Sequence, residues 1–193
     1  TLSKFKTTDV IHLAGLKSVE ESVAKPDLYM DNNVEGSKSL VAAMTASGVY
    51  RLIFSSSATV YGEPKYLPLD EKHPLSPVNP YAESKIRVEQ FLNEVANSNK
   101  VWKVINLRYF NPVGSHPSGL IGDNAKAMKA NLMPMVARVL SGDLDFLEIY
   151  GSDYETRDGT CLRDYIHVSD LAAGHIKAID FLDETKGCTA INL

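Results

Sequence analysis

The sequence predicts an α/β fold in which a parallel β-sheet is covered by helices. Short apolar runs alternate with helical patterns over the first 110 residues. Connections of helix length are what neighbouring parallel strands require. The chain has 193 residues, of which 44% are hydrophobic and 23% charged, as in an ordinary globular domain. These observations favour one main domain with a smaller lobe.

Each predicted element of the first half has its own signal. Three apolar runs are typical of buried strands, and they cover residues 10–13, 51–54 and 101–110. A helix is predicted over about 34–47, where Gly48 provides a stop signal. A second helix is predicted over about 80–96, because Pro80 suits a first helical turn after the proline-rich loop 63–80.

The second half has a looser pattern after Asn111 and predicts a smaller lobe. Apolar residues at helical spacing predict a helix over about 133–140, and a short strand is predicted over 146–150. Residues 164–168 lead into a helix over 169–182, and a strand begins at 191–193. We therefore expect a division into residues 1–112 and 113–193, with 164–193 returning to the main domain.

Composition excludes several classes of function. The chain carries 20 Lys and Arg against 24 Asp and Glu, a net charge of −4, which provides no basic surface for nucleic acid. No apolar run reaches the roughly 20 residues that cross a bilayer, and the N-terminus lacks signal-peptide features. Cys161 and Cys188 have neither metal-ligand spacing nor a disulfide framework. We expect a cytoplasmic protein with no bound metal and no membrane or nucleic-acid partner.

Polar residues whose side chains could bind a ligand or take part in catalysis follow the predicted strands. Ligands collect at the carboxyl ends of parallel strands, which would bring Lys17, Ser57 and Asn111 toward one crevice. Tyr81 and Lys85 lie four apart on a predicted helix and therefore share a face. A nearby ammonium lowers the pKa of a phenol and suits it to general-base chemistry. The alternative is an ordinary surface pair, but a Ser57 hydroxyl at a strand end could hold a substrate oxygen against Tyr81.

Five strings carry a resemblance to a known family. They are His-Leu-Ala-Gly-Leu-Lys at 12–17, Phe-Ser-Ser-Ser-Ala-Thr-Val-Tyr-Gly at 54–62, Tyr-Ala-Glu-Ser-Lys at 81–85, Leu-Arg-Tyr-Phe-Asn-Pro-Val-Gly at 107–114 and Arg-Asp-Tyr-Ile-His-Val at 163–168. Together they resemble the extended short-chain dehydrogenase/reductase family and, within it, the UDP-galactose 4-epimerases. The resemblance implies a Rossmann-like, NAD-binding domain over 1–112 and part of a UDP-sugar-binding lobe over 113–193.

The resemblance also implies an activity and a cofactor. Such enzymes interconvert UDP-galactose and UDP-glucose by NAD-dependent oxidation and re-reduction at sugar carbon 4, through a 4-keto intermediate. Tyr81 would take the proton of the 4-hydroxyl, Lys85 would lower the phenol pKa and bind the nicotinamide ribose, and Ser57 would bridge the 4-oxygen to Tyr81. The NAD site would also include Leu13, Ala14, Lys17, Asn32 and Tyr109.

Substrate contacts follow from the same resemblance. They would come from Ser57, Ala58, Thr59, Phe110, Asn111, Asn131, Leu132, Tyr150 and Arg163. The residues themselves leave other interpretations open. Arg163 could pair with Asp164, Phe110 and Tyr150 could be core aromatics, and Asn111 and Asn131 could be turn residues.

Three competing functions share the same fold. A 4,6-dehydratase of this family would carry an acid pair where this chain has Ala58 and Thr59, neither of which can shuttle a proton for loss of water. Another NAD-dependent nucleotide-sugar epimerase is possible. A non-catalytic nucleotide-sugar-binding protein typically loses the tyrosine or the lysine, and both are present here. The epimerase is favoured.

Two expectations concern the chain as a whole. By the resemblance, a glycine-rich turn would precede Thr1 and a C-terminal substrate lobe would follow Leu193, so we expect an internal segment that is inactive and aggregation-prone by itself. The helices at 34–47 and 81–96 resemble those through which these epimerases form homodimers. We therefore expect a homodimer of an enzyme of galactose metabolism.

Overall fold

The computed structural model describes residues 1–121 and 131–193, and the chain divides into two compact units. The first unit comprises Thr1–Phe110 and Ala173–Leu193, and the second comprises Asn111–Ala172. Each unit is described by itself below. The binding of NAD by residues 1–112 and of a UDP-sugar by residues 113–193 stays a prediction.

A four-stranded parallel sheet forms the centre of the first unit, which confirms the predicted α/β class. Its strand order is β1-β2-β3-β6, and in register Ile53 lies opposite Ile11 and Ile105. The three strands predicted in the first half are present, and the last strand begins at Gly187, before the predicted 191–193. The strands are β1 (Asp9–His12), β2 (Arg51–Ser55), β3 (Lys103–Arg108) and β6 (Gly187–Asn192).

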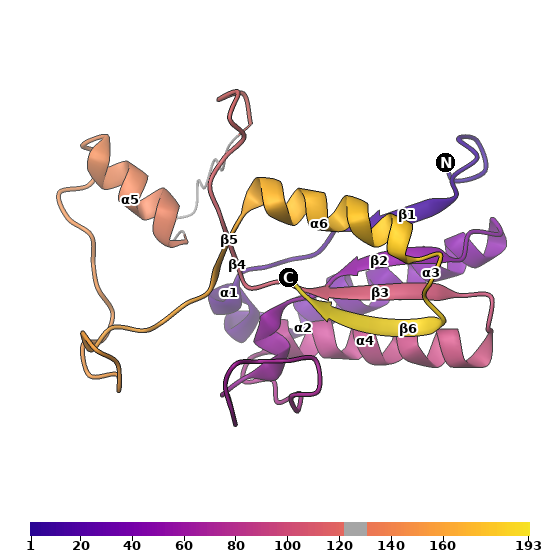
Figure 1. Cartoon of the computed structure of the whole chain (residues 1–193), viewed down its shortest axis with the longest axis horizontal. Coiled ribbons are helices and arrows are strands. Elements are labelled where there is room, and N and C mark those ends of the chain that lie inside the picture. Colours follow the sequence, from indigo (N-terminus) through magenta and orange to yellow (C-terminus); the bar gives the residue numbers. More distant parts are fainter. Residues whose placement is uncertain (122–130) are drawn as a thin grey trace. The chain divides into compact units, whose positions relative to one another are not determined.

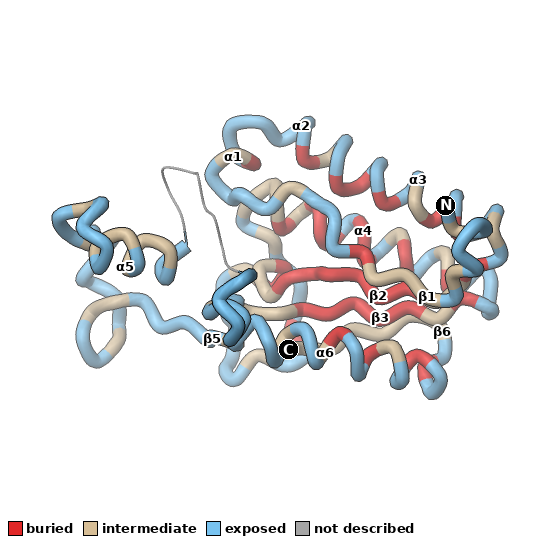
Figure 2. The backbone as a smooth tube through the Cα atoms, turned by 90° about the horizontal axis from the view of Figure 1, so that it is seen from above, coloured by how far each residue is buried: buried red, intermediate tan, exposed pale blue. Residues whose placement is uncertain are grey.

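Helices cover both faces of this sheet, as Figure 1 shows. Side chains alternate along β2, so that Leu52 and Phe54 pack with Met44 and Leu92 on one face while Ile53 packs on the other. The buried central strands lie between the helical layers in Figure 2. The helices are α3 (Gly36–Ala46) and α4 (Pro80–Ser98) on the first face and α6 (Val168–Phe181) on the second.

The start of α4 is defined by its capping residues. The Asn79 side chain accepts a hydrogen bond from Ala82 N at 2.8 Å, and Pro80 occupies the first helical turn. The helix therefore begins where the sequence predicts it. Its buried stripe includes Ala82, Lys85 and Glu89, so two charged side chains lie on the face that packs against the sheet.

Four short helices were not predicted from the sequence. The π-helix η1 continues directly into α3, and η2 follows Ser57 as a single 3₁₀ turn. Each segment has only four to six residues, and those of α1, α2 and η1 are rich in polar residues, so the apolar periodicity that signals a helix is missing. They are α1 (Val19–Ala24), α2 (Pro26–Tyr29), η1 (Met30–Glu35) and η2 (Ala58–Tyr61).

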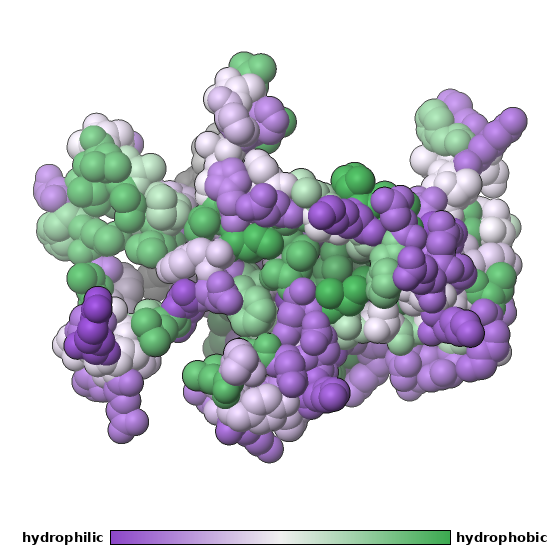
Figure 3. Space-filling view, in the orientation of Figure 1, coloured by the Kyte–Doolittle hydropathy of each residue, from purple (hydrophilic) through white to green (hydrophobic). Residues whose placement is uncertain are grey.

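The second unit contains a two-stranded parallel sheet of β4 (Asn111–Val113) and β5 (Tyr165–His167), together with α5 (Leu132–Leu140). The predicted helix over 133–140 is confirmed as α5, which presents a largely apolar surface in Figure 3. The predicted strand over 146–150 is wrong. Tyr150 is 74% exposed, and this apolar run pairs with no strand of the described residues.

Within residues 1–121 and 131–193, no helix combines the length and the apolar character that crossing a bilayer needs.

Candidate functional site

The predicted reactive residues of the first unit gather at the carboxyl end of its sheet. Ser57 lies two residues beyond β2, Tyr81 occupies the first turn of α4, and Lys85 follows one turn later. Ser57 and Lys85 are buried, and Tyr81 is half-buried. This arrangement brings Ser57, Tyr81 and Lys85 together despite their separation in sequence.

Ser57 and Tyr81 lie close to each other. Ser57 adopts an extended backbone and caps η2, where its Oγ accepts hydrogen bonds from Thr59 N at 3.3 Å and from Thr59 Oγ1 at 3.0 Å. The Ser57 hydroxyl is near enough to the Tyr81 phenol to act on its pKa. Two neighbouring hydroxyl groups can hold one oxygen atom of a ligand and pass a proton to or from it.

The Lys85 ammonium is buried beneath this pair. Its Nζ donates a hydrogen bond to the Ser55 carbonyl oxygen at 2.7 Å and lies 4.8 Å from the centroid of the Phe54 ring. Burial lowers the pKa of Lys85 to about 8, and the charge of Glu89 partly opposes that shift. Lys85 is therefore still mainly protonated at pH 7.

The expected lowering of the Tyr81 pKa by Lys85 is not found. Burial raises the pKa of Tyr81 to about 12, and the nearby Ser57 hydroxyl offsets only part of that effect. The Lys85 Nζ lies 5.8 Å from the centroid of the Tyr81 ring and donates to Ser55 instead. In this structure, desolvation of the phenolate outweighs the distant positive charge.

The loop after β1 carries three of the expected cofactor-binding residues, Leu13, Ala14 and Lys17, and Asn32 lies in η1. All four are exposed, and a Cβ added at Gly15 of the loop would lie 3.8 Å from Lys85 Nζ. The loop therefore passes close to the buried ammonium, with its side chains accessible to a ligand.

Asn33, which the sequence analysis did not single out, fixes this loop. Its Oδ1 accepts from Leu16 N at 2.8 Å, and its Nδ2 donates to the Leu16 carbonyl oxygen at 3.0 Å and to Ser84 Oγ at 3.1 Å. Asn33 is 4% exposed and connects the loop through Ser84 to the helix that carries Tyr81. The π-helical turn of η1 places it there.

His12 is packed at the end of β1. It lies 2.8 Å from Ser37 Oγ, whose single proton is donated to the Asn33 carbonyl oxygen at 2.6 Å. The Nε2 atom of His12 must therefore be the donor, and the ring is held as one neutral tautomer. Burial, with a contribution from the charge of Lys85, lowers the pKa of His12 to about 4.

Tyr109 follows β3 and is half-buried. Its ring centroid lies 6.0 Å from that of His175 of α6, which contacts the Ser55 hydroxyl of β2 at 3.2 Å. Burial raises the pKa of Tyr109, and the nearby Ser55 hydroxyl opposes that shift. The expected cofactor-binding tyrosine therefore lies between the end of β2 and α6.

A buried ion pair lies on the opposite side of Lys85 along α4. Arg108 donates to the two carboxylate oxygens of Glu89 from Nε at 3.0 Å and from Nη2 at 2.5 Å. Glu89 also accepts a hydrogen bond from Ser56 Oγ at 2.5 Å, and Arg108 Nη1 donates to Tyr61 Oη at 3.2 Å. Burial acts to lower the pKa of Arg108, but the hydrogen bonds and charge of Glu89 raise it overall.

The remaining expected substrate residues of the first unit have structural contacts. Ala58 N donates to the Tyr109 carbonyl oxygen at 3.0 Å, and Phe110 N donates to the Leu193 carbonyl oxygen at 3.2 Å. Ala58, Thr59 and Phe110 are half-buried. Their substrate contacts stay predictions.

The second unit holds the other expected substrate residues. Asn111 donates from N and Nδ2 to the Asp164 carbonyl oxygen, at 3.1 and 2.9 Å, which joins the starts of β4 and β5. Arg163 is exposed and donates to the Leu162 carbonyl oxygen at 2.7 Å, and no ion pair with Asp164 is found among the described residues. Tyr150 is exposed and donates to Glu148, which excludes the core-aromatic alternative.

Asn131 and Leu132 begin α5. Asn131 is its N-terminal capping residue but makes no side-chain capping hydrogen bond, and Leu132 is 46% exposed. Both side chains of this second unit are accessible. Their role in substrate binding stays a prediction.

Asn33, Glu89 and Arg108 are the site residues that sequence reasoning missed. Glu89 lies two turns after Tyr81 on α4, so a carboxylate on the buried stripe of that helix was an available signal. Its partner could not be identified, because Arg108 lies at the end of a different element. Nothing in the sequence distinguished Asn33 from the polar residues beside it.

Comparison with known proteins places these features in context. The whole chain, residues 1–193, matches the NAD dependent epimerase/dehydratase family. It is similar to the UDP-glucose 4-epimerase of Homo sapiens, with 50% identity over 191 residues, covering 98% of this chain and 55% of that protein. A UDP-glucose 4-epimerase of Cyamopsis tetragonoloba is 51% identical over 99% of this chain and 55% of its own length. The chain thus spans about half the length of the curated relatives it matches.

Solved structures give the same result. The structure is similar to UDP-glucose 4-epimerase from Bifidobacterium longum in complex with NAD⁺ and UDP, with a TM-score of 0.92, 49% identity, and coverage of 100% of this chain and 58% of that one. It is also similar to the Stenotrophomonas maltophila enzyme with bound NAD and formylated UDP-arabinopyranose, with a TM-score of 0.96, 43% identity, and coverage of 100% and 57%.

Proposed function

The chain belongs to the NAD dependent epimerase/dehydratase family, and from this premise we propose that the protein interconverts UDP-galactose and UDP-glucose at sugar carbon 4. The observation that carries the proposal is the neighbouring hydroxyl groups of Ser57 and Tyr81 at the carboxyl end of the sheet, with the buried Lys85 one turn along α4. The similarity to UDP-glucose 4-epimerases along nearly the whole chain supports it.

The residues around Lys85 fit the binding of NAD. The loop after β1 exposes Leu13, Ala14 and Lys17 close to the buried ammonium, as the distance from Gly15 indicates. Ammonium and amide groups of Lys17, Lys85 and Asn32 are hydrogen-bond donors suited to ribose and phosphate oxygens. Tyr109 would complete the site. When bound, NAD supplies the acceptor and donor of a hydride at carbon 4.

In the proposed mechanism, the protein handles the proton of the sugar 4-hydroxyl. Ser57 would hold the 4-oxygen, and the proton of the 4-hydroxyl would pass to the Tyr81 phenolate by way of the Ser57 hydroxyl. Tyr81 can accept this proton only in its ionised form, so its pKa of about 12 has to fall when cofactor and substrate occupy the site. Lys85, whose Nζ lies 5.8 Å from the centroid of the Tyr81 ring, is the cation of this chain that would stabilise the phenolate.

Ala58 and Thr59 would contact the substrate, and contacts with its nucleotide part are proposed for Phe110 and for residues of the second unit. Arg163 carries a guanidinium, which is suited to bidentate capture of diphosphate oxygens. Asn111, Asn131, Leu132 and Tyr150 would add polar and apolar contacts to the nucleotide.

The test is turnover by the complete natural polypeptide that contains residues 1–193. With NAD present, it should convert UDP-galactose into UDP-glucose, measured by nucleotide-sugar chromatography. The same incubation distinguishes the dehydratase, because loss of water would give a 4-keto-6-deoxy product that mass spectrometry detects. Appearance of that product, or no conversion at all, would refute the epimerase assignment.

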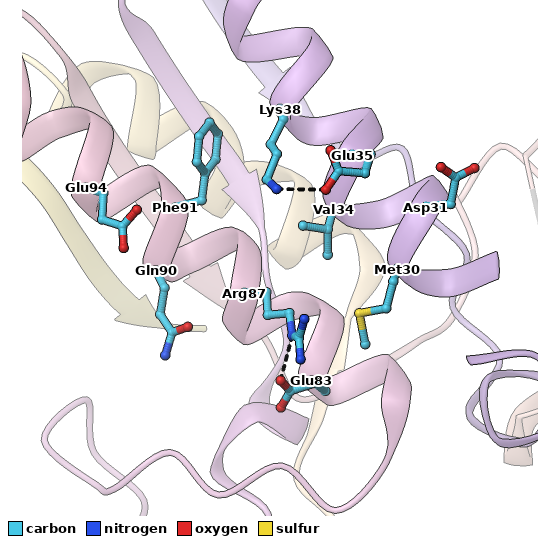
Figure 4. Close-up of a pocket in the computed structure, with 10 residues that line it drawn as sticks. All are labelled: Met30, Asp31, Val34, Glu35, Lys38, Glu83, Arg87, Gln90, Phe91 and Glu94. Atoms are coloured by element: carbon cyan, nitrogen blue, oxygen red, sulfur yellow. Dashed lines mark hydrogen bonds and ion pairs between the residues drawn. The ribbon is translucent and has the colours of Figure 1, made fainter. Parts of the chain in front are cut away.

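We also propose that the protein forms a homodimer through η1, α3 and α4. A groove between these helices has an apolar floor that includes Met30, Val34 and Phe91 (Figure 4). Its sides carry the ion pairs Lys38–Glu35 and Arg87–Glu83, each at 2.7 Å. Since both signs of charge occur on both sides, a second copy related by a two-fold axis can meet the groove with complementary charges.

Light scattering of the complete polypeptide at micromolar concentration tests the dimer. The wild-type mass should be twice that of the polypeptide, and Phe91→Glu should shift it toward the monomer because a carboxylate would enter the apolar floor. Ile176→Glu, on the exposed surface of α6, is the matched control and should stay dimeric. A monomeric wild type would contradict the proposal.

A cytoplasmic location and a role in galactose metabolism complete the proposed function. Cys161 and Cys188 are free thiols, which suits a reducing compartment. Fractionation of cells that express the complete polypeptide tests the location, and accumulation of UDP-galactose after its deletion tests the role.

A further inference from the structure

The buried ion pair of Glu89 and Arg108 lies outside the residues assigned to catalysis or binding, yet it touches their neighbours. Glu89 follows Tyr81 and Lys85 at the same four-residue spacing, so the three side chains share one face of α4. Glu89 accepts from Ser56, the residue before Ser57. Arg108 is the residue before Tyr109.

We propose that the Glu89–Arg108 pair is a positioning element of the proposed epimerase site: it fixes α4 against the ends of β2 and β3, and its carboxylate provides the negative charge that keeps Lys85 in its ammonium form. This inference rests on the proposed function. Neither residue is assigned a contact with substrate or cofactor. They act through Ser57, Lys85 and Tyr109.

The hydrogen bonds account for the positioning. One carboxylate joins three elements, because it belongs to α4, accepts from Ser56 after β2 and pairs with Arg108 of β3. Arg108 extends the connection to Tyr61, whose hydroxyl donates to Asn192 Oδ1 of β6 at 2.5 Å. A shift of α4 along the sheet would break several charge-assisted hydrogen bonds at once.

The charges around Lys85 account for the electrostatic role. Among the described residues, the titratable groups found to interact with Lys85 are Glu89 and Tyr81 on α4 and His12 on β1. The Glu89 carboxylate is itself paired with the Arg108 guanidinium of β3. His12 is neutral near pH 7 because its pKa is about 4, and Tyr81 is neutral because its pKa is about 12. Glu89 is therefore the negative charge that opposes the loss of the Lys85 proton caused by burial.

The test compares Glu89→Gln with wild type in the complete natural polypeptide with NAD. Glutamine keeps the shape but removes the charge and one partner of Arg108. We expect kcat to fall by about ten- to a hundredfold at pH 7, since small misplacements of reacting groups have effects of this size. We expect the KM for UDP-galactose to change little. The alkaline limb of the kcat profile should move to lower pH by about one unit.

NMR spectroscopy of the protein with ¹³C-labelled lysine measures the titration of Lys85 independently of activity. The Lys85 ¹³Cε signal is assigned as the one that is missing in Lys85→Met. Glu89→Gln should lower the Lys85 midpoint, and Glu89→Asp should restore it toward the wild-type value. Asp9→Asn is the matched control, because it removes an acid from another arginine pair at the amino end of the sheet. It should leave kcat and the Lys85 midpoint unchanged.

The double variant Glu89→Leu/Arg108→Met serves as a control for loss of folding, because it leaves no unpaired buried charge. It should fold, and like Glu89→Gln it should show slower turnover and a lower Lys85 titration midpoint than wild type. Wild-type kcat and Lys85 titration in folded Glu89→Gln or in the double variant would overturn the inference. An inactive wild type would instead overturn the proposed function, while the Lys85 titration would still decide the electrostatic role.

Discussion

The two ends of the central sheet each carry an arginine paired with acidic side chains, and the two pairs differ in almost every respect. At the amino end, Arg51 of β2 bonds Asp9 and Asp183, whose side chains are 20% and 74% exposed. At the carboxyl end, the Arg108 and Glu89 side chains are 7% and 6% exposed. The first pair remains in contact with water, and the second is almost fully removed from it.

This difference shows how the same residue types serve two purposes. Arg51 also donates to the Ile179 carbonyl oxygen at 3.0 Å, so it ties β1, β2 and α6 together where no predicted site residue lies. Arg108 and Glu89 connect the residues next to Ser57, Lys85 and Tyr109. Burial of ions is costly unless they are well paired, so the carboxyl-end pair depends on complete hydrogen bonding. We expect changes at that end to have the larger effects.

The largest effect should come from Tyr81→Phe in the complete polypeptide. Removal of the phenol oxygen leaves the sugar proton without its acceptor, and loss of one general base typically lowers turnover by about 10² to 10⁴. UDP-galactose binding, measured by calorimetry, should stay within a few-fold. The matched change at the amino end is Tyr50→Phe, which should keep normal turnover. Near-normal turnover of Tyr81→Phe would contradict the proposal that the carboxyl end of the sheet carries the catalytic residues.

Denaturant unfolding sharpens the comparison of the two arginines. Arg108→Met leaves Glu89 buried without its cation and should cost about 3–5 kcal/mol of unfolding free energy. Arg51→Met should cost about 1 kcal/mol, since its partners are solvated. Equal losses of unfolding free energy in the two variants would mean that burial does not determine how much each ion pair contributes to stability.

The proposed catalytic residues at this carboxyl end could be predicted from the sequence more completely than the residues that support them. Tyr81, Lys85 and Ser57 could be singled out because helical spacing and position after an apolar run are local signals. The Glu89–Arg108 pair joins two elements that only the folded chain brings together. The π-helical turn at Asn33 has no apolar period, and the expected strand at 146–150 fails because strand formation requires a partner, which apolar residues alone do not specify.

The carboxyl end should also respond to pH through His12. Its pKa is about 4 in the folded protein against 6.5 ordinarily, so the unfolded chain binds more protons between these values. The contribution of neutral His12 to the free energy of unfolding is therefore fully present above pH 6.5 and is lost as the pH falls toward 4. The loss between pH 7 and 5 should be about 2 kcal/mol. His12→Gln, which cannot titrate, should lose less over that interval in urea unfolding. An identical loss would contradict the neutral, buried His12.

The smallest effect should come from Asp9→Asn at the amino end. Arg51 keeps Asp183 and the Ile179 carbonyl oxygen as partners, and a solvated pair contributes about 0–1 kcal/mol. Salt screens such charges, so the difference from wild type should shrink further in about 1 M salt. A loss comparable to that of Arg108→Met would show that both ends depend equally on their ion pairs.

The position of the second unit in the chain has a consequence for the speed of folding. Asn111–Ala172 follows β3 and ends within the first half of α6, so Lys103 pairs with Gly187 only after a long loop has closed. Pairing of β1 with β2 and of β2 with β3 spans much shorter stretches of chain. The entropy of loop closure grows only logarithmically, by about 0.6 kcal/mol for each doubling of length. Folding kinetics should therefore tolerate large changes in the length of the second unit, while substitutions that weaken β6 act directly on the last and most distant strand of the sheet.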